Sequence, residues 1–251
     1  MKRIGITIFS LLLSTIIYAG QKSSGSPTDA VLNFYRALKA KQYVEGFRHS
    51  VFRNAVEGLT PAELSDLEPD FNRTFSAIPD KIEPHGEQIK GETAVVFLKF
   101  EGMEGLQQVA LVRSGGEWLV GDEETLGVVR AQGRAFFFNA RITVNENETG
   151  DMLSRIIGAE VIYSQKYEGR NATLEELIAL GGVPKDLEGG QSSGYKFTLA
   201  VSGDRKSFSA TALPIVYGKT GRLSFYADIN GVHAEDLKGR PASANSPVYK
   251  K

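Results

Sequence analysis

The amino-acid sequence predicts an α+β protein built of two halves. In each half, apolar residues recur first with the spacing of a helix and then with the alternation of a strand. The order of helix and then strand therefore occurs twice along the chain. Hydrophobic residues make up 41% and charged residues 24% of the sequence, which is the composition of a globular protein rather than a disordered one.

The first half begins with helices. Ser26-Pro27 supplies a capping serine followed by a proline at the first helical position. The apolar stripe of this first helix consists of Val31, Phe34, Tyr35 and Leu38, at i, i+3, i+4 and i+7. We expect a second short helix around residues 43–51. A third begins at Thr60-Pro61-Ala62-Glu63, which has the pattern of a capping box.

Strands follow these helices. Residues 93–100 and 106–113 are rich in β-branched and apolar side chains, and Ser114-Gly115-Gly116-Glu117 is a turn that leads into a returning strand at Trp118. Helices followed by antiparallel strands predict that the helices cover one face of a curved sheet.

Three segments of this half carry a resemblance to a known superfamily. They are DAVLNFYRAL at 29–38, KGETAVV at 90–96 and GEWLV at 116–120. In this order they resemble the NTF2-like (cystatin-like) superfamily, and most closely its lumazine-binding-like extracytoplasmic members. The resemblance covers residues 27–125 and implies a cone-shaped domain, in which a small apolar ligand or an isomerase-like site is expected in the cavity.

The second half repeats the order of helix and then strands. A helix is predicted over residues 151–166, and Thr173-Leu174-Glu175-Glu176 is a capping box that begins a shorter one. Alternating apolar residues predict strands near 195–201, 208–212 and 223–229, and Asn230-Gly231 turns the last of these into a short return.

One helix packed on an antiparallel meander resembles the globular head of type IV pilin-like and type II pseudopilin-like proteins, over residues 148–236. The chain departs from that family because it lacks the prepilin cleavage motif and the glutamate near the start of a long apolar helix. The resemblance implies an accessory component of a type II secretion or type IV pilus apparatus, whereas the departure favours a pilin-like head used apart from a fibre.

The first twenty residues have the pattern of a signal peptide. Lys2 and Arg3 precede an apolar run over residues 4–17, and small residues end it, so cleavage is expected after Ala19 or Gly20. An uncleaved anchor is the alternative, but a run of about 14 residues is short for a bilayer span. We therefore expect a periplasmic or secreted protein of a bacterial envelope, with membrane contact only through a retained leader.

The predicted organisation is a signal peptide at 1–20, a Gly/Ser-rich spacer at 21–26, an NTF2-like domain at 27–125 and a junction at 126–150. A pilin-like head at 151–236 and a disordered tail at 237–251 follow. Within the junction, Phe136-Phe137-Phe138 is interpreted as a last strand of the first domain, and the Asn/Glu run at 145–150 as the linker.

Charge and cysteine content exclude several classes of function. The formal net charge is −1, which favours neither nucleic acid nor anionic lipid as a partner. The sequence contains no cysteine, which excludes disulfides, thiol nucleophiles and cysteine-ligated metal centres. No phosphate-binding glycine motif and no G-x-S-x-G motif is present, and we expect no cofactor.

The remaining candidate residues all have structural interpretations. His49, His85 and His233 share no spacing that would bring them to one metal ion. Asp228-Ile229-Asn230-Gly231 is similar to the start of a calcium loop but lacks the downstream acid, so a hairpin turn is favoured. Tyr35 and Trp118 are expected in the core, although Tyr35 and His49 are also candidates for a cavity.

No residue set indicates catalysis, so we assign no catalytic, cofactor-binding or metal-binding residue. The sequence favours a non-enzymatic binding or scaffold protein whose partner is an envelope or secretion-system protein. The alternatives are the secretion or pilus accessory and the small-ligand-binding or isomerase-like protein.

Overall fold

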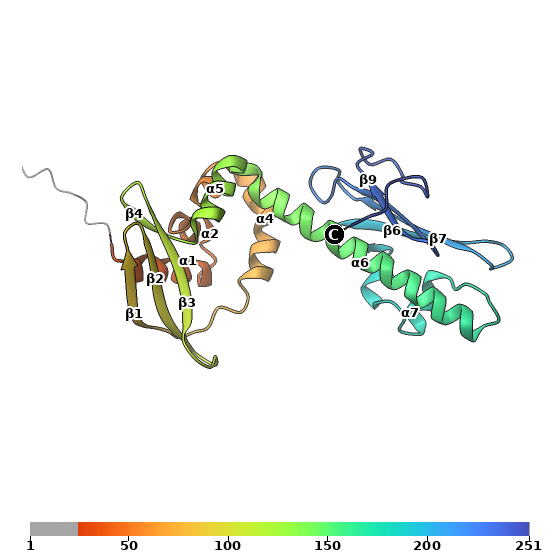
Figure 1. Cartoon of the computed structure of the whole chain (residues 1–251), viewed down its shortest axis with the longest axis horizontal. Coiled ribbons are helices and arrows are strands. Elements are labelled where there is room, and N and C mark those ends of the chain that lie inside the picture. The colour runs from red at the N-terminus through yellow and green to blue at the C-terminus, as the bar shows by residue number, and fades with distance from the viewer. Residues whose placement is uncertain (1–24, 251) are drawn as a thin grey trace, which may run out of the picture.

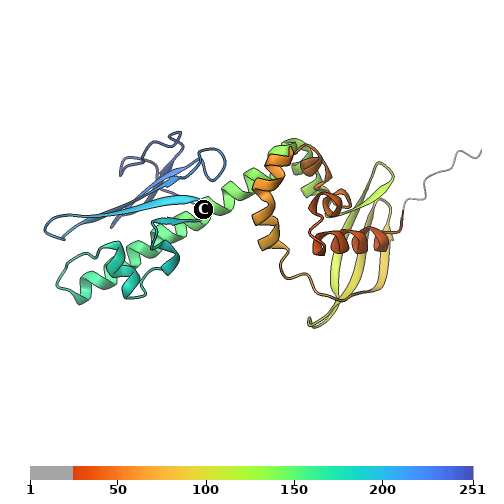
Figure 2. The same cartoon turned by 180° about the vertical axis from the view of Figure 1, so that it is seen from behind.

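The computed structural model describes residues 25–250 and has two lobes joined by one long helix, α6 (Figures 1 and 2). The described chain is α+β, as predicted, with an antiparallel sheet of four strands in the first lobe and one of five strands in the second. The leader, with its expected cleavage positions Ala19 and Gly20, lies outside the described residues.

The first lobe contains four helices and then four strands. The helices are α1 (Pro27–Lys39), α2 (Tyr43–Arg48), α3 (Arg53–Glu57) and α4 (Pro61–Thr74), and the strands, in spatial order, are β1 (Ile82–Lys90), β2 (Thr93–Phe100), β3 (Gln107–Ser114) and β4 (Glu117–Val120). Capping boxes begin α1 at Ser26 and α4 at Thr60, as their sequences predict.

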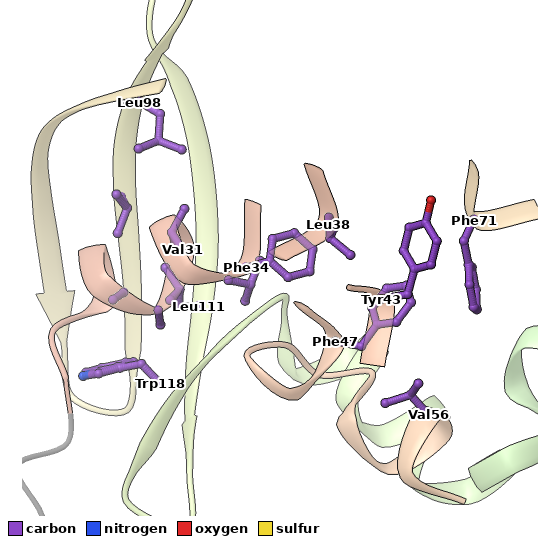
Figure 3. Close-up of a cluster of buried hydrophobic side chains, with 14 of the residues drawn as sticks. Val31, Phe34, Leu38, Tyr43, Phe47, Val56, Phe71, Leu98, Leu111 and Trp118 are labelled. Atoms are coloured by element: carbon purple, nitrogen blue, oxygen red, sulfur yellow. The ribbon is translucent and has the colours of Figure 1, made fainter. Parts of the chain in front are cut away.

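The core of the first lobe lies between α1 and the sheet and extends to α2 and α4. Val31 of α1 lies beside Leu98 and Leu111 of the sheet, and Phe34 and Leu38 extend the cluster toward α2 (Figure 3). Aromatic rings continue the core beyond the sheet, since Phe47 lies 5.1 Å from Phe71 between ring centroids. Side chains of α1 and of the sheet therefore pack together in the space between them.

The connection between the lobes is helical, which corrects the predicted junction. After α5 (Glu123–Gln132) and a 3-10 turn (Gly133–Ala135), α6 runs from Phe136 to Lys166. Phe136-Phe137-Phe138 is thus the first turn of α6 and not a strand. Its rings join the core of the first lobe, where Phe137 lies 5.0 Å from Phe47.

The Asn/Glu run that was expected to be a linker is also part of α6. Asn145 donates from Nδ2 to the carbonyl of Thr220 (2.9 Å), and Oε1 of Glu146 accepts from the amides of Arg222 (2.8 Å) and Leu223 (3.0 Å). These polar side chains bind the β7–β8 connection, so their polarity reflects a contact between segments and not a break in the helix.

The second lobe packs the C-terminal part of α6 against the larger sheet. The remaining elements are α7 (Leu174–Ala179), a 3-10 turn (Lys185–Leu187), β5 (Gln191–Ser192), β6 (Tyr195–Val201), β7 (Phe208–Pro214), β8 (Ser224–Asp228) and β9 (Gly231–Glu235). The strands pair in sequence order, so the sheet is the expected meander with the short β5 added at one edge.

The tail, which was expected to be disordered, is ordered as far as it is described. The amide of Ala234 donates to the carbonyl of Pro247 and that of Tyr249 to the carbonyl of Val232, both at 2.9 Å, so the tail lies along the edge of β9. The ring of Tyr249 lies 5.2 Å from that of Phe225 and against Gly150 of α6, where a Cβ atom would lie only 2.4 Å from the ring. The tail is therefore held by these backbone hydrogen bonds and by the packing of Tyr249 on Phe225 and Gly150.

Candidate functional site

The three histidines lie in three separate parts of the structure. His49 follows α2 and lies 3.5 Å from Glu45, His85 is on β1, and His233 on β9 lies 2.7 Å from the carbonyl oxygen of Ser246. Over residues 25–250, no group of three or more histidine, aspartate or glutamate side chains could hold a metal ion.

Asp228 closes the hairpin between β8 and β9. Its Oδ1 accepts from the amide of Asn230 (2.8 Å), its Oδ2 accepts from the hydroxyl of Tyr226 (3.3 Å), and Asp228 pairs with Gly231 across the turn. The hairpin interpretation is therefore confirmed, and both carboxylate oxygens take part in it.

Tyr35 and Trp118 belong to the core of the first lobe, as expected. Tyr35 packs edge-on against Phe34 (5.2 Å) and Phe100 (5.4 Å), and burial raises the pKa of its hydroxyl. Trp118 is buried and has the guanidinium of Arg113 5.7 Å from its ring. His49 pairs with Glu45, whereas Tyr35 makes its ring contacts with Phe34 and Phe100, so different residues surround the two.

An open groove lies between α2 and α4 of the first lobe, and we call it the α2–α4 groove. Its volume is about 720 Å³. Val44 and Leu64 are partly exposed in it, and Tyr43 and Phe71 form its floor with ring centroids 5.2 Å apart. The groove therefore offers an apolar floor that is open to solvent.

The hydroxyl of Tyr43 ties the two sides of the groove together. It donates to Oδ1 of Asn72 on α4 (2.6 Å), and its pKa is raised by burial and further by the negative charge of Glu68. At neutral pH this tyrosine is a hydrogen-bond donor and not a base, so it positions α2 against α4.

Charged residues of both signs border the groove. Lys41 lies at one end, Arg48 bonds to Glu45 (3.2 Å) and lies 3.7 Å from Glu57, and Glu68 projects from α4. No hydroxyl in the groove lies beside a histidine or carboxylate in the way a nucleophile and its base do. The arrangement suits binding through apolar contacts with charged groups at the rim.

Sequence reasoning did not identify this groove. Leu64 and Leu67 lie three residues apart, at helical spacing on one face of α4, but Leu67 is fully buried whereas Leu64 is partly exposed. Periodicity shows which face of a helix is apolar. It does not show where a neighbouring helix stops covering that face.

No protein-family model matches the chain, and neither a curated protein nor a solved structure matches it. Among residues 25–250, no helix is both long enough and apolar enough to cross a bilayer.

Proposed function

We propose that this chain is a non-enzymatic, extracytoplasmic binding or scaffold protein of the bacterial cell envelope. In this proposal an NTF2-like first lobe and a pilin-like second lobe are held at a set separation. The observation that carries it is that one helix, α6, takes part in both cores.

The two cores use opposite ends of α6. Near its start, Phe137 packs on Phe47 and Phe71, each with ring centroids 5.0 Å away. In its C-terminal half, Leu153 and Ile156 are buried in the second lobe. At 1.5 Å per residue, Phe137 and Ile156 lie about 28 Å apart along the axis. A continuous helix of this length acts as a spacer because bending it would break its hydrogen bonds.

Polar contacts brace this spacer where the lobes meet. Arg141 of α6 bonds to Oδ2 of Asp70 (2.6 Å) and to Oδ1 of Asp66 (3.2 Å), both on α4. Lys219, from the second lobe, lies 3.3 Å from the other carboxylate oxygen of Asp66. Asp66 thus links α4, α6 and the β7–β8 connection, which supports a scaffold role.

The α2–α4 groove is the binding surface we assign to the scaffold. The groove has an apolar floor and a rim with positive and negative side chains. Both fit a segment of a folded or extended protein, because such a segment offers apolar and charged side chains. Its openness to solvent favours a protein partner over a small apolar ligand, which binds in pockets that bury most of its surface.

A site-specific photocrosslinker tests this function. Placed at Ser65, which lines the groove, the crosslinker should capture a discrete envelope protein from cells. Placed at Thr74, exposed on the same helix but outside the groove, it should not. Equal capture from both positions, or a turnover activity abolished by one substitution in the groove, would contradict the proposal.

An accessory role in a type II secretion or type IV pilus apparatus is the second candidate. It is supported by the second lobe, in which one helix packs on an antiparallel meander as the pilin-like resemblance implies. The start of α6 packs in the first lobe and is not available for fibre assembly. A crosslinker at Ile162, exposed on α6, should then capture a pilin or secretion subunit, and its failure to do so would remove this candidate.

A small-ligand or isomerase-like role for the first lobe has the least support. The space between α1 and the sheet holds packed side chains, including Leu98 and Leu111 (Figure 3). A proton-transfer site needs a polar group that faces a cavity large enough for the substrate.

A further inference from the structure

The second lobe has a free sheet edge along the last residues of β6. The short β5 pairs only with Tyr195 and Lys196, and the amide of Phe197 donates to the carbonyl of Gly190 (2.7 Å). Beyond Phe197, no described strand pairs with β6 on the side opposite β7. Because ladder groups alternate in direction along a strand, the N–H and C=O groups of Leu199 and Val201 point to this free side.

Two other sheet edges of the described chain, those of β1 and β9, are protected. On β1, Pro84 lacks an amide hydrogen, a bulge lies between Pro84 and Gly86, and Lys90 ends the strand with a charge. The edge of β9 is covered by the tail through Val248. Bulges, prolines and charges are the devices that prevent edge pairing. Residues 198–201 of β6, Thr-Leu-Ala-Val, have none of them.

A groove of about 410 Å³ runs beside this free edge. Phe197, Leu199 and Val201 form its sheet side, and the first turn of α7 with Leu174 forms the opposite wall. Leu174, Leu199 and Val201 are only partly buried there. The groove therefore joins unpaired ladder groups to uncovered apolar side chains, which are the two elements of strand addition.

We propose that this edge binds an extended peptide segment of a partner protein as an added strand. An apolar side chain of the peptide enters the groove, while its backbone pairs with Leu199 and Val201. We name this surface the β6 edge site. It lies in the second lobe, apart from the α2–α4 groove, so it goes beyond the proposed function and can fail without it.

The walls of the β6 edge site select the kind of occupant. The first turn of α7 forms the wall of the groove opposite the sheet edge. Glu175 lines the groove, is exposed, and forms no ion pair with any described residue. A peptide with a lysine or arginine beside its apolar residue would place opposite charges together.

The experiment uses the whole chain and a fluorescein-labelled peptide of alternating valine and threonine with a lysine at each end. We expect saturable binding by fluorescence anisotropy, with amide shifts in NMR spectra concentrated at Leu199 and Val201. Methylation of the peptide's backbone nitrogens on one edge should weaken binding at least tenfold. This control leaves the protein unchanged, so it is independent of folding.

Charge reversal supplies the second test. Glu175→Lys should weaken binding of the lysine-ended peptide at least tenfold and restore it for a glutamate-ended peptide. Glu92→Lys, an exposed acid in the β1–β2 turn of the first lobe, is the matched control and should have no effect. No binding, binding insensitive to backbone methylation, shifts centred on β1, or self-association of the chain without peptide would each overturn the proposal.

Discussion

The two lobes differ in where their cores place aromatic rings and small side chains. In the first lobe, the rings of Phe34, Phe47 and Phe71 come from three helices, and those of Phe47 and Phe71 meet beyond the sheet. In the second lobe, the sheet itself supplies the rings, Tyr195, Phe197 and Phe225, and sets them beside the buried alanines Ala210, Ala212 and Ala227.

This difference follows from what covers each sheet. The first lobe has several short helices that meet at irregular angles, and rings fill the gaps between them. The second lobe has one long helix lying on its sheet, and small side chains let the two approach closely, with Leu153 and Ile156 inserted between them. Rings fill irregular gaps between several short helices, whereas alanines on a sheet leave room for one helix to lie close to it.

The largest expected effect comes from truncating a side chain of α6 that is buried in the core of the second lobe. Leu153 is fully buried, and Leu153→Ala removes its contacts where backbone elements leave little room to collapse, so we expect a loss of about 3 kcal/mol in the free energy of unfolding. Urea unfolding followed by far-UV circular dichroism measures it. Ile162→Ala, on the same helix but 69% exposed, should change stability by less than about 0.5 kcal/mol.

The same variant shows whether the lobes unfold together. Trp118, the only tryptophan, is buried in the first lobe, so its fluorescence reports that lobe alone. Because α6 is shared, we expect the tryptophan and dichroism midpoints to fall together in Leu153→Ala. A tryptophan midpoint that stays at the wild-type value would mean that α6 does not couple the cores.

Arg141 provides the next test, at the point where the lobes meet. Its side chain is 12% exposed, and Arg141→Ala would leave Asp66 and Asp70 close together without their shared cation. Both acids are partly solvated, so we expect a loss of about 1–2 kcal/mol rather than that of a fully buried pair. Differential scanning calorimetry should also show a broader transition, because the lobes would be less tightly coupled.

Arg73→Ala is the matched control for Arg141. Arg73 also pairs with Asp70, at 3.4 Å, but its side chain is 67% exposed, so its removal should change stability by less than about 0.5 kcal/mol. Equal effects of the two substitutions would contradict a bracing role for Arg141.

Within the described part of the chain, the second lobe differs from the first in having a buried acidic side chain, that of Glu160. Its Oε2 accepts from the amide of Ala172 (2.9 Å) and from Nδ2 of Asn171 (3.1 Å), while Oε1 has no hydrogen-bond partner among the described residues. Burial raises the pKa of this carboxyl, although these two donors and the charge of Arg205 oppose the rise.

A raised pKa in the folded state means that folding favours the protonated acid. Its contribution to stability is therefore greatest below the pKa of the unfolded chain and decreases as pH rises through the folded pKa. Glu160→Gln should be more stable than the wild type at pH 7, by on the order of 1 kcal/mol, with a smaller difference at pH 4. Urea midpoints at the two pH values measure it. A glutamine variant that is less stable at pH 7 would show that the ionised acid is fully compensated.

The sequence predicts some helices and strands of the two lobes closely and misses others. The helices beginning at Ser26 and Thr60 and the strand at 93–100 are predicted closely, because caps and alternating apolar residues are local signals. Strand β1 escapes prediction because residues 84–90 are mostly exposed on both faces and include Pro84 and Gly86, so no alternation exists.

The start of α6 escapes prediction for the opposite reason. Three consecutive phenylalanines suggest a strand, and the polar run that follows suggests a linker, because their partners are distant in sequence. Asp122, whose carboxylate accepts from the amide of Thr125 (2.7 Å), was a local signal for the start of α5. Neither groove could be predicted, since both depend on where one element ceases to cover another.

The smallest expected effect concerns the tail, which adds the ring of Tyr249 to the core of the second lobe. Tyr249 lies against Phe225 and Gly150, so Tyr249→Ala should release the tail from the β9 edge. The global loss should stay near 1 kcal/mol, because the segment can detach while the sheet remains intact. The amide of Ala234, which donates to Pro247, should exchange with solvent at least tenfold faster, whereas Val248→Ala, at a side chain 63% exposed, should leave it protected. Unchanged exchange at Ala234 in Tyr249→Ala would show that the strand pairing, and not the ring, holds the tail in place.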